Sequence, residues 1–295
     1  MMVQLSLFDE SVAIPVVNVA SVPHRSPFRY PGGKTWLVPR IRQWLSSLAF
    51  LPDKFVEPFC GGAIVGLTVA FEQRARQVIL VEKDEQIAAV WDTILNQDGG
   101  AEWLANEIVS FEITHASVED LLARSPQSRS EMALQTIVQN RTSHGGILAP
   151  GAGMIKHGEN GKGLRSRWYP ETLRKRILAI GRVRDRIIFE QGDAFEAIEQ
   201  YADDQRSVCF IDPPYTASTK RAGARLYKYH QIDHNELFRL TATLAGDFLM
   251  TYDNAEEVRS LAEEQGFETR LVAMSNTHHA TLKELLIGRN LNWVQ

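Results

Sequence analysis

The sequence has little of what marks exported, membrane-bound or disulfide-stabilised proteins. Only two cysteines occur among 295 residues, which is too few for a disulfide framework or a structural zinc site. No uninterrupted apolar stretch has the length needed to span a bilayer. The first residues carry Asp9 and Glu10 instead of a basic region, so a secretory signal is not expected. These absences predict a protein of the cytoplasm.

Two common nucleotide-binding fingerprints are also missing. Residues 61–66 read Gly-Gly-Ala-Ile-Val-Gly and lack the alternating glycines of dinucleotide-binding turns, which disfavours a nicotinamide-dependent enzyme. Residues 31–35 read Pro-Gly-Gly-Lys-Thr and superficially resemble a phosphate loop. That motif requires a glycine five residues before Gly33, where this chain has Phe28, so binding of a nucleoside triphosphate is disfavoured too.

Basic residues are unevenly distributed along the chain. The net charge of −4 argues against a uniformly basic nucleic-acid binder. Residues 141–186 nevertheless contain eleven basic and three acidic side chains, so this segment is about +8 and the remainder about −12. A basic block within an acidic chain suits a surface that contacts nucleic-acid phosphates. Exposed, solvated helix faces are the alternative explanation.

The order of apolar segments predicts an open α/β sheet that is interrupted by an insertion. We expect strands at 54–56, 77–81, 187–190, 207–211, 248–251, 268–274 and 284–288, and helices at 35–48, 63–73, 85–96, 171–186, 233–245 and 254–265. The β-α-β-α order near the start argues for a parallel, doubly wound sheet. Residues 1–26 are expected to form a flexible tail, 27–98 with 185–295 one α/β domain, and 99–184 a mainly helical insertion.

The segment with the most specific chemistry follows the expected strand at 207–211. It consists of Asp212, Pro213, Pro214 and Tyr215, and its two prolines make the loop stiff. A carboxylate, a backbone carbonyl and an aromatic ring thus lie next to one another, which suits the binding of a planar, amino-bearing base. The alternative is an ordinary strand end with a turn, so other segments must decide between the two.

Further carboxylates follow other strands of the expected sheet. Glu82 ends the strand at 77–81, twenty residues after Gly62, where an acid can accept hydrogen bonds from ribose hydroxyls. Asp193 follows the strand near 187–190, although such a residue alone is more often the N-cap of a helix. The Gly-rich turn at residues 61 and 62 lies just beyond another strand, where a backbone without Cβ atoms can approach a ligand.

Together these segments resemble the Dam-like DNA adenine-N6 methyltransferases, over about residues 28–287 and with gaps inside the insertion. The resemblance implies a Rossmann-like methyltransferase sheet that binds S-adenosylmethionine, with 99–184 as a DNA target-recognition domain. The cofactor-binding residues that it implies are Tyr30, Gly32, Gly33, Lys34, Glu57, Pro58, Phe59, Gly61, Gly62, Glu82, Asp193, Ala194 and Phe195. Residues 212–215 would hold the target base.

The resemblance also implies a role for each base-binding group. An adenine amino nitrogen is a poor nucleophile because its lone pair is conjugated into the ring. Asp212 and the Pro213 carbonyl would each accept one amino hydrogen, which favours a pyramidal nitrogen whose lone pair is aimed at the methyl group. Tyr215 would stack on the base, a contact of about 1–3 kcal/mol in single-strand binders. The base must first leave the double helix by flipping, which costs a few kcal/mol.

The insertion departs from the family pattern, so the DNA sequence that it recognises is not inherited from the resemblance. Asn140 and Arg141 match a family signature, but the segments at 143–147 and 149–154 differ from the Asn-Gly-Leu and Phe-Asn-Val-Pro of the family. The residues expected to contact DNA are Asn140, Arg141, Lys156, Arg165, Arg167 and Trp168. For Trp168 a core position is the alternative.

The N-terminal tail contains a second resemblance, to the short peptide with which bacterial proteins dock on the DNA polymerase sliding clamp. Residues 4–8 carry it through Gln4, Leu5, Leu7 and Phe8. The Leu-Phe pair would fill an apolar pocket while the glutamine bonds to its rim. A plain disordered start is the alternative, and clamp docking would place the protein at the nucleoid.

Two other functions remain compatible with the sequence. An N4-cytosine methyltransferase would act on a different exocyclic amine, although such enzymes more often have serine in place of Asp212. A clamp-tethered DNA-binding protein without catalysis is the other. The retention of Lys34, Glu82, Asp193 and Asp212 argues against it.

Overall fold

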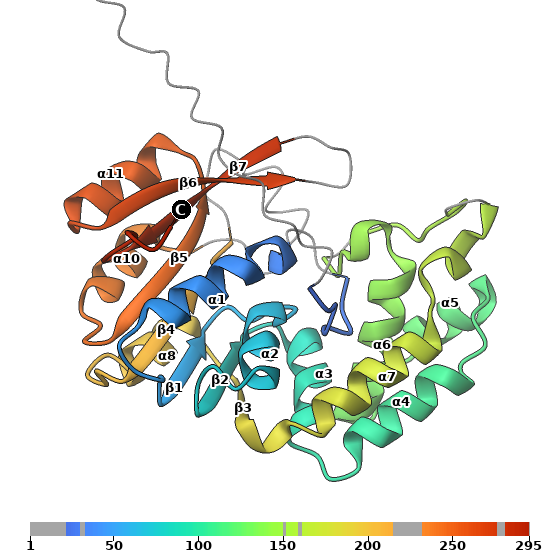
Figure 1. Ribbon diagram of the computed structural model, residues 1–295. Helices are drawn as coiled ribbons and strands as arrows, with labels where there is room; N and C mark the ends of the chain where they lie inside the picture. Colours follow the sequence, from blue (N-terminus) through green and yellow to red (C-terminus); the bar gives the residue numbers. More distant parts are fainter. Residues whose placement is uncertain are drawn as a thin grey trace, which may run out of the picture.

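The computed structural model describes residues 22–29, 33–149, 152–158, 161–214, 232–275 and 281–294. Within them an α/β part with a central sheet lies beside a group of helices that comes from the middle of the chain (Figure 1). The expected clamp peptide at 4–8, together with Tyr30, Gly32 and Tyr215, lies outside the described residues.

The sheet has seven strands in the order β3-β2-β1-β4-β5-β7-β6. They are β1 (Lys54–Glu57), β2 (Gln77–Glu82), β3 (Ile187–Gln191), β4 (Ser207–Ile211), β5 (Asp247–Asp253), β6 (Glu268–Ser275) and β7 (Thr281–Gly288). The first five strands in this order are parallel, and β7 lies antiparallel between β5 and β6. The predicted doubly wound α/β sheet is confirmed, whereas the antiparallel β7 was not predicted.

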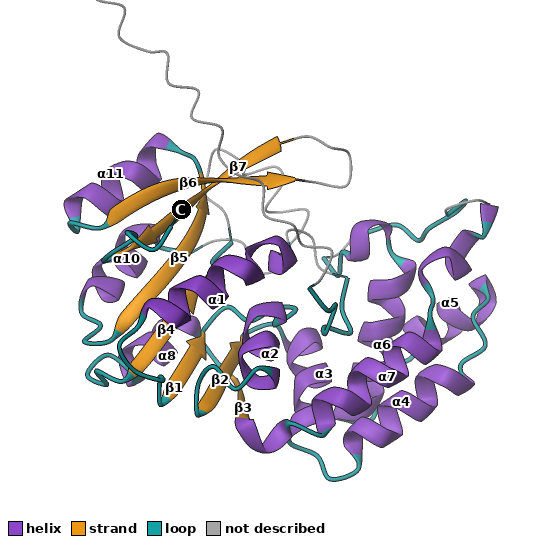
Figure 2. Cartoon of the chain, in the orientation of Figure 1, coloured by secondary structure: helices purple, strands orange, loops and turns teal. Residues whose placement is uncertain are grey.

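The central strands have mainly apolar interiors with polar residues near their ends, because helices cover both faces of the sheet (Figure 2). In β2, Val78 and Leu80 point into one core, whereas Ile79 and Val81 point into the other. In β4, Phe210 and Ile211 divide in the same way. This alternation is the period-two geometry of a strand, and it makes continuous apolar runs the signature of a buried sheet.

Helices from both halves of the chain form these two covering layers. The first core includes residues of α1 (Val38–Ser47), α2 (Ile64–Phe71) and α3 (Glu85–Leu95). The second includes residues of α8 (Ala194–Gln200), α10 (His234–Ala242) and α11 (Glu256–Glu264). The helix expected from residue 35 begins with a 3₁₀ turn, η1 (Lys34–Leu37), which continues directly into α1.

The middle of the chain forms a helical layer that packs beside α3. It contains α4 (Gly100–Ser110), α5 (His115–Ala123), α6 (Arg129–Thr142), α7 (Pro170–Gly181) and the 3₁₀ turns η2 (His144–Gly146) and η4 (Gly163–Arg167). α6 packs on α3 and α7 packs on α4 (Figure 1). The helix expected at 171–186 ends at Gly181, and a separate turn, η5 (Arg184–Arg186), leads into β3. Target recognition by this layer stays a prediction.

A short N-terminal segment, residues 22–29, is held against the helical layer. Asn140 of α6 accepts a hydrogen bond from Arg29 N at 2.8 Å and donates to Arg29 O at 2.8 Å. Its amide also donates to Gly146 O at 2.6 Å. A Cβ at position 146 would lie 2.4 Å from Arg29 O, so this contact requires glycine. Because Val22 and Ser26 are buried here, the predicted end of the tail at residue 26 is too late.

Candidate active site

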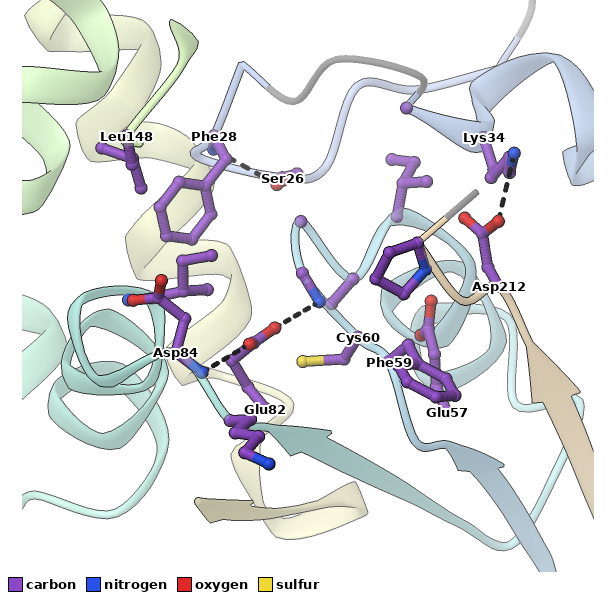
Figure 3. A pocket seen from close by; sticks show the side chains of 18 of the residues that line it. Ser26, Phe28, Lys34, Glu57, Phe59, Cys60, Glu82, Asp84, Leu148 and Asp212 are labelled. Atoms are coloured by element: carbon purple, nitrogen blue, oxygen red, sulfur yellow. Dashed lines mark hydrogen bonds and ion pairs between the residues drawn. The ribbon is translucent and has the colours of Figure 1, made fainter. Parts of the chain in front are cut away.

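The carboxyl ends of the central strands border a cavity of about 580 Å³ (Figure 3). Ligand pockets commonly have volumes of about 300–1,000 Å³. The cavity lies where the strand order reverses, between β1 and β4, which is where open α/β sheets bind their ligands. Of the site residues predicted from the sequence, the cavity is lined by Gly33, Lys34, Glu57, Pro58, Phe59, Gly61, Gly62, Glu82, Asp193, Ala194, Phe195, Asp212, Pro213 and Pro214.

The Gly-rich turn after β1 has a shape that its surroundings fix. Gly61 has a φ of 45°, and its carbonyl accepts a hydrogen bond from Trp91 Nε1 at 2.8 Å. Ala63 has a φ of 49°, a left-handed conformation that costs a non-glycine residue about 1–2 kcal/mol. Such strain persists only where the packing around it determines the backbone, so the turn is preorganised before any ligand binds.

Glu82, at the end of β2, accepts a hydrogen bond at each of its two carboxylate oxygens, and one of these bonds comes from the Gly-rich turn. Its Oε2 accepts a hydrogen bond from Gly61 N at 2.9 Å, and its Oε1 accepts one from Asp84 N at 2.7 Å (Figure 3). Burial raises the pKa of Glu82 to about 7, although these backbone hydrogen bonds act in the opposite direction. The side chain therefore exchanges a proton near neutral pH.

Glu57, at the end of β1, is a buried acid in close contact with α2. Its Oε2 accepts a hydrogen bond from Gly66 N at 2.7 Å. A Cβ at Gly66 would lie 2.4 Å from that oxygen, so the approach of helix and carboxylate depends on glycine. Burial raises the pKa of Glu57 well above its usual range, and the neighbouring charge of Asp212 adds to this effect. The neutral form of Glu57 is thereby favoured.

Asp193 is the N-cap of α8, and the sequence had already allowed this capping role as an alternative to cofactor binding. Its side chain accepts a hydrogen bond from Phe195 N at 2.8 Å and pairs with Lys83 Nζ at 2.8 Å. Burial alone would raise its pKa, but the bonds from Lys83 and the Phe195 amide outweigh burial and lower it. Asp193 still lines the cavity, so capping does not exclude the predicted contact with the cofactor.

Asp212 directly follows β4, and one of its two oxygens is anchored. Its Oδ1 accepts a hydrogen bond from Thr251 Oγ1 at 2.8 Å and lies 3.2 Å from Lys34 Nζ. Lys34 in turn lies 3.0 Å from Glu284 Oε2 of β7. No hydrogen bond or ion pair to Oδ2 is seen within the described parts of the chain, and the side chain is 24% exposed. Oδ2 is thus available to a ligand while Oδ1 fixes the carboxylate.

The charge state of Lys34 follows from the same contacts. Burial alone would lower its pKa, but the charges of Asp212 and Glu284 outweigh burial and raise the pKa above its usual value. Lys34 therefore remains an ammonium that holds Asp212. The sequence predicted Lys34 as a cofactor contact, and the structure adds this link to Asp212, at the start of the predicted base-binding loop.

Thr251 and Glu284 were not identified from the sequence. Neither the threonine nor the glutamate belongs to a recognisable sequence motif. They reach the site only because β4, β5 and β7 are neighbours in the sheet. The position of Thr251 near the end of β5, beside the strand that precedes Asp212, is the one signal that could have indicated it.

The residues predicted to contact DNA fall into two groups. Lys156 and Arg165 are exposed and Arg167 is partly exposed, so all three can reach a partner. Asn140 has no exposed surface and bonds to backbone atoms, while Arg141 is only 5% exposed and lines the cavity. DNA contact by these five residues stays a prediction.

Trp168 occupies the core position that was its alternative role. It is 8% exposed and packs edge-on against Phe111, with the ring centroids 6.0 Å apart. A buried indole cannot enter a DNA groove without leaving this packing, so the predicted intercalating contact is not what the structure shows.

Two further classes of feature were searched for among the described residues. No group of three or more His, Cys, Asp or Glu side chains is arranged to hold a metal ion. No described helix combines the length and the apolar composition that crossing a membrane requires.

A match to one protein-family model supports, over part of the chain, the resemblance predicted from the sequence. The family model of the D12 class N6 adenine-specific DNA methyltransferases matches residues 30–125. An rRNA methyltransferase from Streptomyces viridochromogenes has a TM-score of 0.40 at 15% identity, covering 88% of this chain and 87% of that chain. Precorrin-6y C5,15-methyltransferase from Geobacter metallireducens GS-15 has a TM-score of 0.35 at 9% identity, covering 85% and 86%. No curated protein matches the chain.

The family match identifies a methyltransferase with S-adenosylmethionine as its methyl donor. The cavity lining fits this cofactor, which carries a sulfonium and an ammonium against one carboxylate and is therefore a net cation. Acidic side chains line the sheet side of the cavity, namely Glu57, Glu82, Asp193 and Asp212. The turn at Gly61 and Gly62 has no Cβ atoms that would keep a ligand away from the backbone.

Proposed function

We propose that the chain is a site-specific DNA methyltransferase that methylates the N6 amino group of a flipped-out adenine in double-stranded DNA. The observation that carries the proposal is the geometry of Asp212, whose Oδ1 is fixed by Thr251 and Lys34. An oriented carboxylate at the end of a strand, next to two prolines and above the switch point of the sheet, supports binding of an exocyclic amine. The D12 class family match favours adenine in DNA.

The residues of the chain orient the amine and accept its hydrogens. S-adenosylmethionine would supply an electrophilic methyl group and would leave as S-adenosylhomocysteine once its methyl–sulfur bond breaks. Asp212 Oδ2 and the Pro213 carbonyl each accept a hydrogen bond from the amino group, which turns its lone pair out of conjugation with the ring. When the new carbon–nitrogen bond has formed, the nitrogen carries an extra proton, and Asp212 Oδ2 is placed to accept it. Stiff positioning by the prolines contributes to rate as well as to affinity.

The helical layer would supply the contacts that select a DNA site. The basic block at 141–186 lies in this layer, and its exposed side chains Lys156 and Arg165 are free of the core. Phosphate contacts position a protein on DNA without reading the sequence, whereas base edges specify it. We therefore assign 99–184 to target recognition and 27–98 with 185–295 to catalysis.

A direct test is to express the protein in cells that lack DNA methylation and to map modified bases by single-molecule sequencing. N6-methyladenine at one recurring sequence is the expected result. N4-methylcytosine would favour the alternative substrate, and the absence of any modified base would contradict the proposal.

The Asp212→Ala variant tests the assigned mechanism. We expect methyl transfer to fall by at least about 100-fold, the scale of losing a polar transition-state contact, while cofactor affinity stays nearly unchanged. Asp98→Ala is a matched control, because the Asp98 side chain is 94% exposed and pairs only with a surface arginine, Arg184. Near-normal turnover of Asp212→Ala would refute the mechanism.

We also propose that residues 4–8 dock the enzyme on the sliding clamp. Deletion of residues 4–8 should abolish co-purification with the clamp, since Leu7 and Phe8 would be the apolar anchors. Methylation of a short, clamp-free duplex should be unchanged, which controls for folding. Clamp binding by the deleted protein would exclude this peptide as the tether.

A further inference from the structure

Three arginines from separate segments meet on the helical side of the cavity. Arg29 belongs to the N-terminal segment 22–29, Arg141 to α6 and Arg176 to α7, and all three line the cavity. Burial, together with the smaller effects of the charges of Arg176, Arg29 and Arg167, lowers the pKa of Arg141 to about 9. Arg141 and Arg176 also bond to the carbonyls of Pro27 and Ser26, so both guanidinium groups reach the same stretch of the N-terminal segment that carries Arg29.

No carboxylate of the described residues forms an ion pair with Arg29, Arg141 or Arg176. The partners seen are backbone carbonyls: Arg141 donates to Pro27 O, and Arg176 Nη1 donates to Ser26 O at 3.1 Å. Arg141 is only 5% exposed, and its Nε has no hydrogen-bond partner. Arg29 Nη1 is likewise buried without a partner. Buried charges are normally paired, so this cluster is poised to receive an anion.

Acidic side chains line the sheet side of the cavity and arginines line the helical side, and this separation indicates which kind of anion the arginines would bind. The two lysines that line the cavity, Lys34 and Lys83, pair with Asp212 and Asp193 on the sheet side. Glu82 and Asp84 line the same side in addition to these pairs, so acidic groups remain there for the cationic cofactor. The cofactor carboxylate has an ammonium on the adjacent carbon, which three arginines would repel. A phosphodiester carries a full negative charge with no attached cation, and it therefore suits the arginine side.

We propose that Arg29, Arg141 and Arg176 form a binding site for one DNA phosphodiester group that adjoins the flipped nucleotide. This inference rests on the proposed function, because it requires DNA as the substrate. A guanidinium binds phosphate oxygens through two parallel N–H donors, and it suits phosphate better than an ammonium does. A nucleotide that rotates into the cavity brings its flanking phosphates with it, so the cluster would hold the extruded nucleotide by its backbone and leave the base free for Asp212.

The test compares Arg176→Gln with Arg239→Gln. Arg239 lies on α10, outside the basic block at 141–186, and its side chain is 72% exposed and pairs with Glu236, so it serves as the control. The probe is a duplex that carries the mapped methylation site, and binding is measured by fluorescence anisotropy over a range of KCl concentrations. Cofactor affinity is measured separately by calorimetry. Arg176→Lys tests whether charge alone is sufficient, and thermal melting checks that each variant is folded.

We expect Arg176→Gln to bind the duplex about ten- to a hundredfold more weakly, the scale of one lost charged hydrogen bond. The slope of log affinity against log salt should become less steep by about one. The cofactor dissociation constant should stay within about twofold. A methylphosphonate at one phosphate that flanks the target adenine should weaken wild-type binding similarly and should add little to Arg176→Gln, because both changes remove the same contact.

Two results would overturn the inference while leaving the proposed function intact. Weaker cofactor binding with unchanged DNA affinity would assign the arginines to the cofactor carboxylate. Unchanged affinity for both would make them a purely structural link to residues 26 and 27. If the wild-type protein neither binds nor methylates the duplex, the proposed function is wrong, and the proposed phosphate site is then wrong as well. Arg29→Gln provides a second variant, since Arg29 is held through its backbone and not through its side chain.

Discussion

Replacing Thr251 by valine tests whether the orientation of Asp212 limits the rate of methyl transfer. Thr251 is wholly buried in β5, and its hydroxyl donates to Asp212 Oδ1 at 2.8 Å. Valine retains the size and the branching of the side chain but removes the donor. Oδ1 would then keep the 3.2 Å contact with Lys34 of η1. The carboxylate would remain close to its place, but it could rotate.

The size of the effect follows from the bond that is removed. A hydrogen bond to a charged group contributes about 1.5–3 kcal/mol, which is about a 10- to 150-fold change in rate if it acts wholly in the transition state. Because Lys34 still restrains Oδ1, we expect the lower end, about a tenfold decrease in kcat. The KM for DNA and the dissociation constant of the cofactor should change by less than about twofold, since Thr251 is wholly buried and is not among the residues that line the cavity.

The assay is single-turnover methylation of a duplex that carries the mapped site, with melting temperature as a folding check. Thr251→Ser is the matched variant, because it keeps the hydroxyl and loses one methyl group, and it should retain about half or more of wild-type kcat. Equal losses in both variants would show that packing, and not the hydrogen bond, is responsible. A raised KM with unchanged kcat would show that Asp212 contributes only ground-state binding.

Two further predictions concern the cofactor side of the cavity and its packing. In the wild type, Glu82 ionises as the pH rises through about 7, so affinity for the cationic cofactor should increase from pH 6 to 8 in calorimetry, and Glu82→Gln should remove this dependence. The folded pKa of Glu82 lies above its ordinary 4.5, so the ligand-free protein should also lose stability as the pH rises from about 4.5 to 7. An increase in stability over this pH range would contradict the raised pKa of Glu82. Gly66→Ala should lower the free energy of unfolding by about 1–3 kcal/mol, because the added Cβ would lie 2.4 Å from Glu57 Oε2. Gly192→Ala, whose Cβ would meet Val81 at an ordinary 3.7 Å, should change it by less than about 0.5 kcal/mol in the same denaturant titration.

The sequence was sufficient for the parts of the fold that local patterns encode. Apolar runs predicted β2, β3 and β4 to within a residue or two, because strands covered on both faces have no polar alternation. The direction of β7 could not be predicted, because the same alternation of side chains serves parallel and antiparallel pairing. The order of the strands likewise depends on which loops cross the sheet, and no residue encodes that alone.

The candidate site was predictable where chain position fixes spatial position. Glu57, Glu82 and Asp212 each end a parallel strand, and parallel strands end at the same edge, so their meeting follows from the sequence. Thr251 and Glu284 contact the site only because β5 and β7 are neighbours in the sheet. Such contacts depend on tertiary packing, which a single sequence does not reveal.

In the helical layer, too, residue type alone did not predict which side chains are buried. Trp168 and Asn140 have the residue types of DNA contacts, yet one packs in the core and the other binds backbone atoms. The cluster of Arg29, Arg141 and Arg176 joins residues that are up to 147 positions apart, because α6, α7 and the N-terminal segment meet at the cavity. The count of charged residues indicated a basic region, but it could not show that these three arginines line the same cavity.

The place of β7 in the sheet also bears on when the enzyme becomes active during its synthesis. β7 follows every other strand of the sheet along the chain, yet it lies between β5 and β6 and supplies Glu284 to the Lys34–Asp212 pair. A nascent chain that has not yet released residues 281–288 from the ribosome would have β5 as an unpaired edge and Lys34 without Glu284. The Lys34 contact with Glu284, and with it the full set of contacts around Asp212, would therefore form only after the last strand of the sheet has been translated.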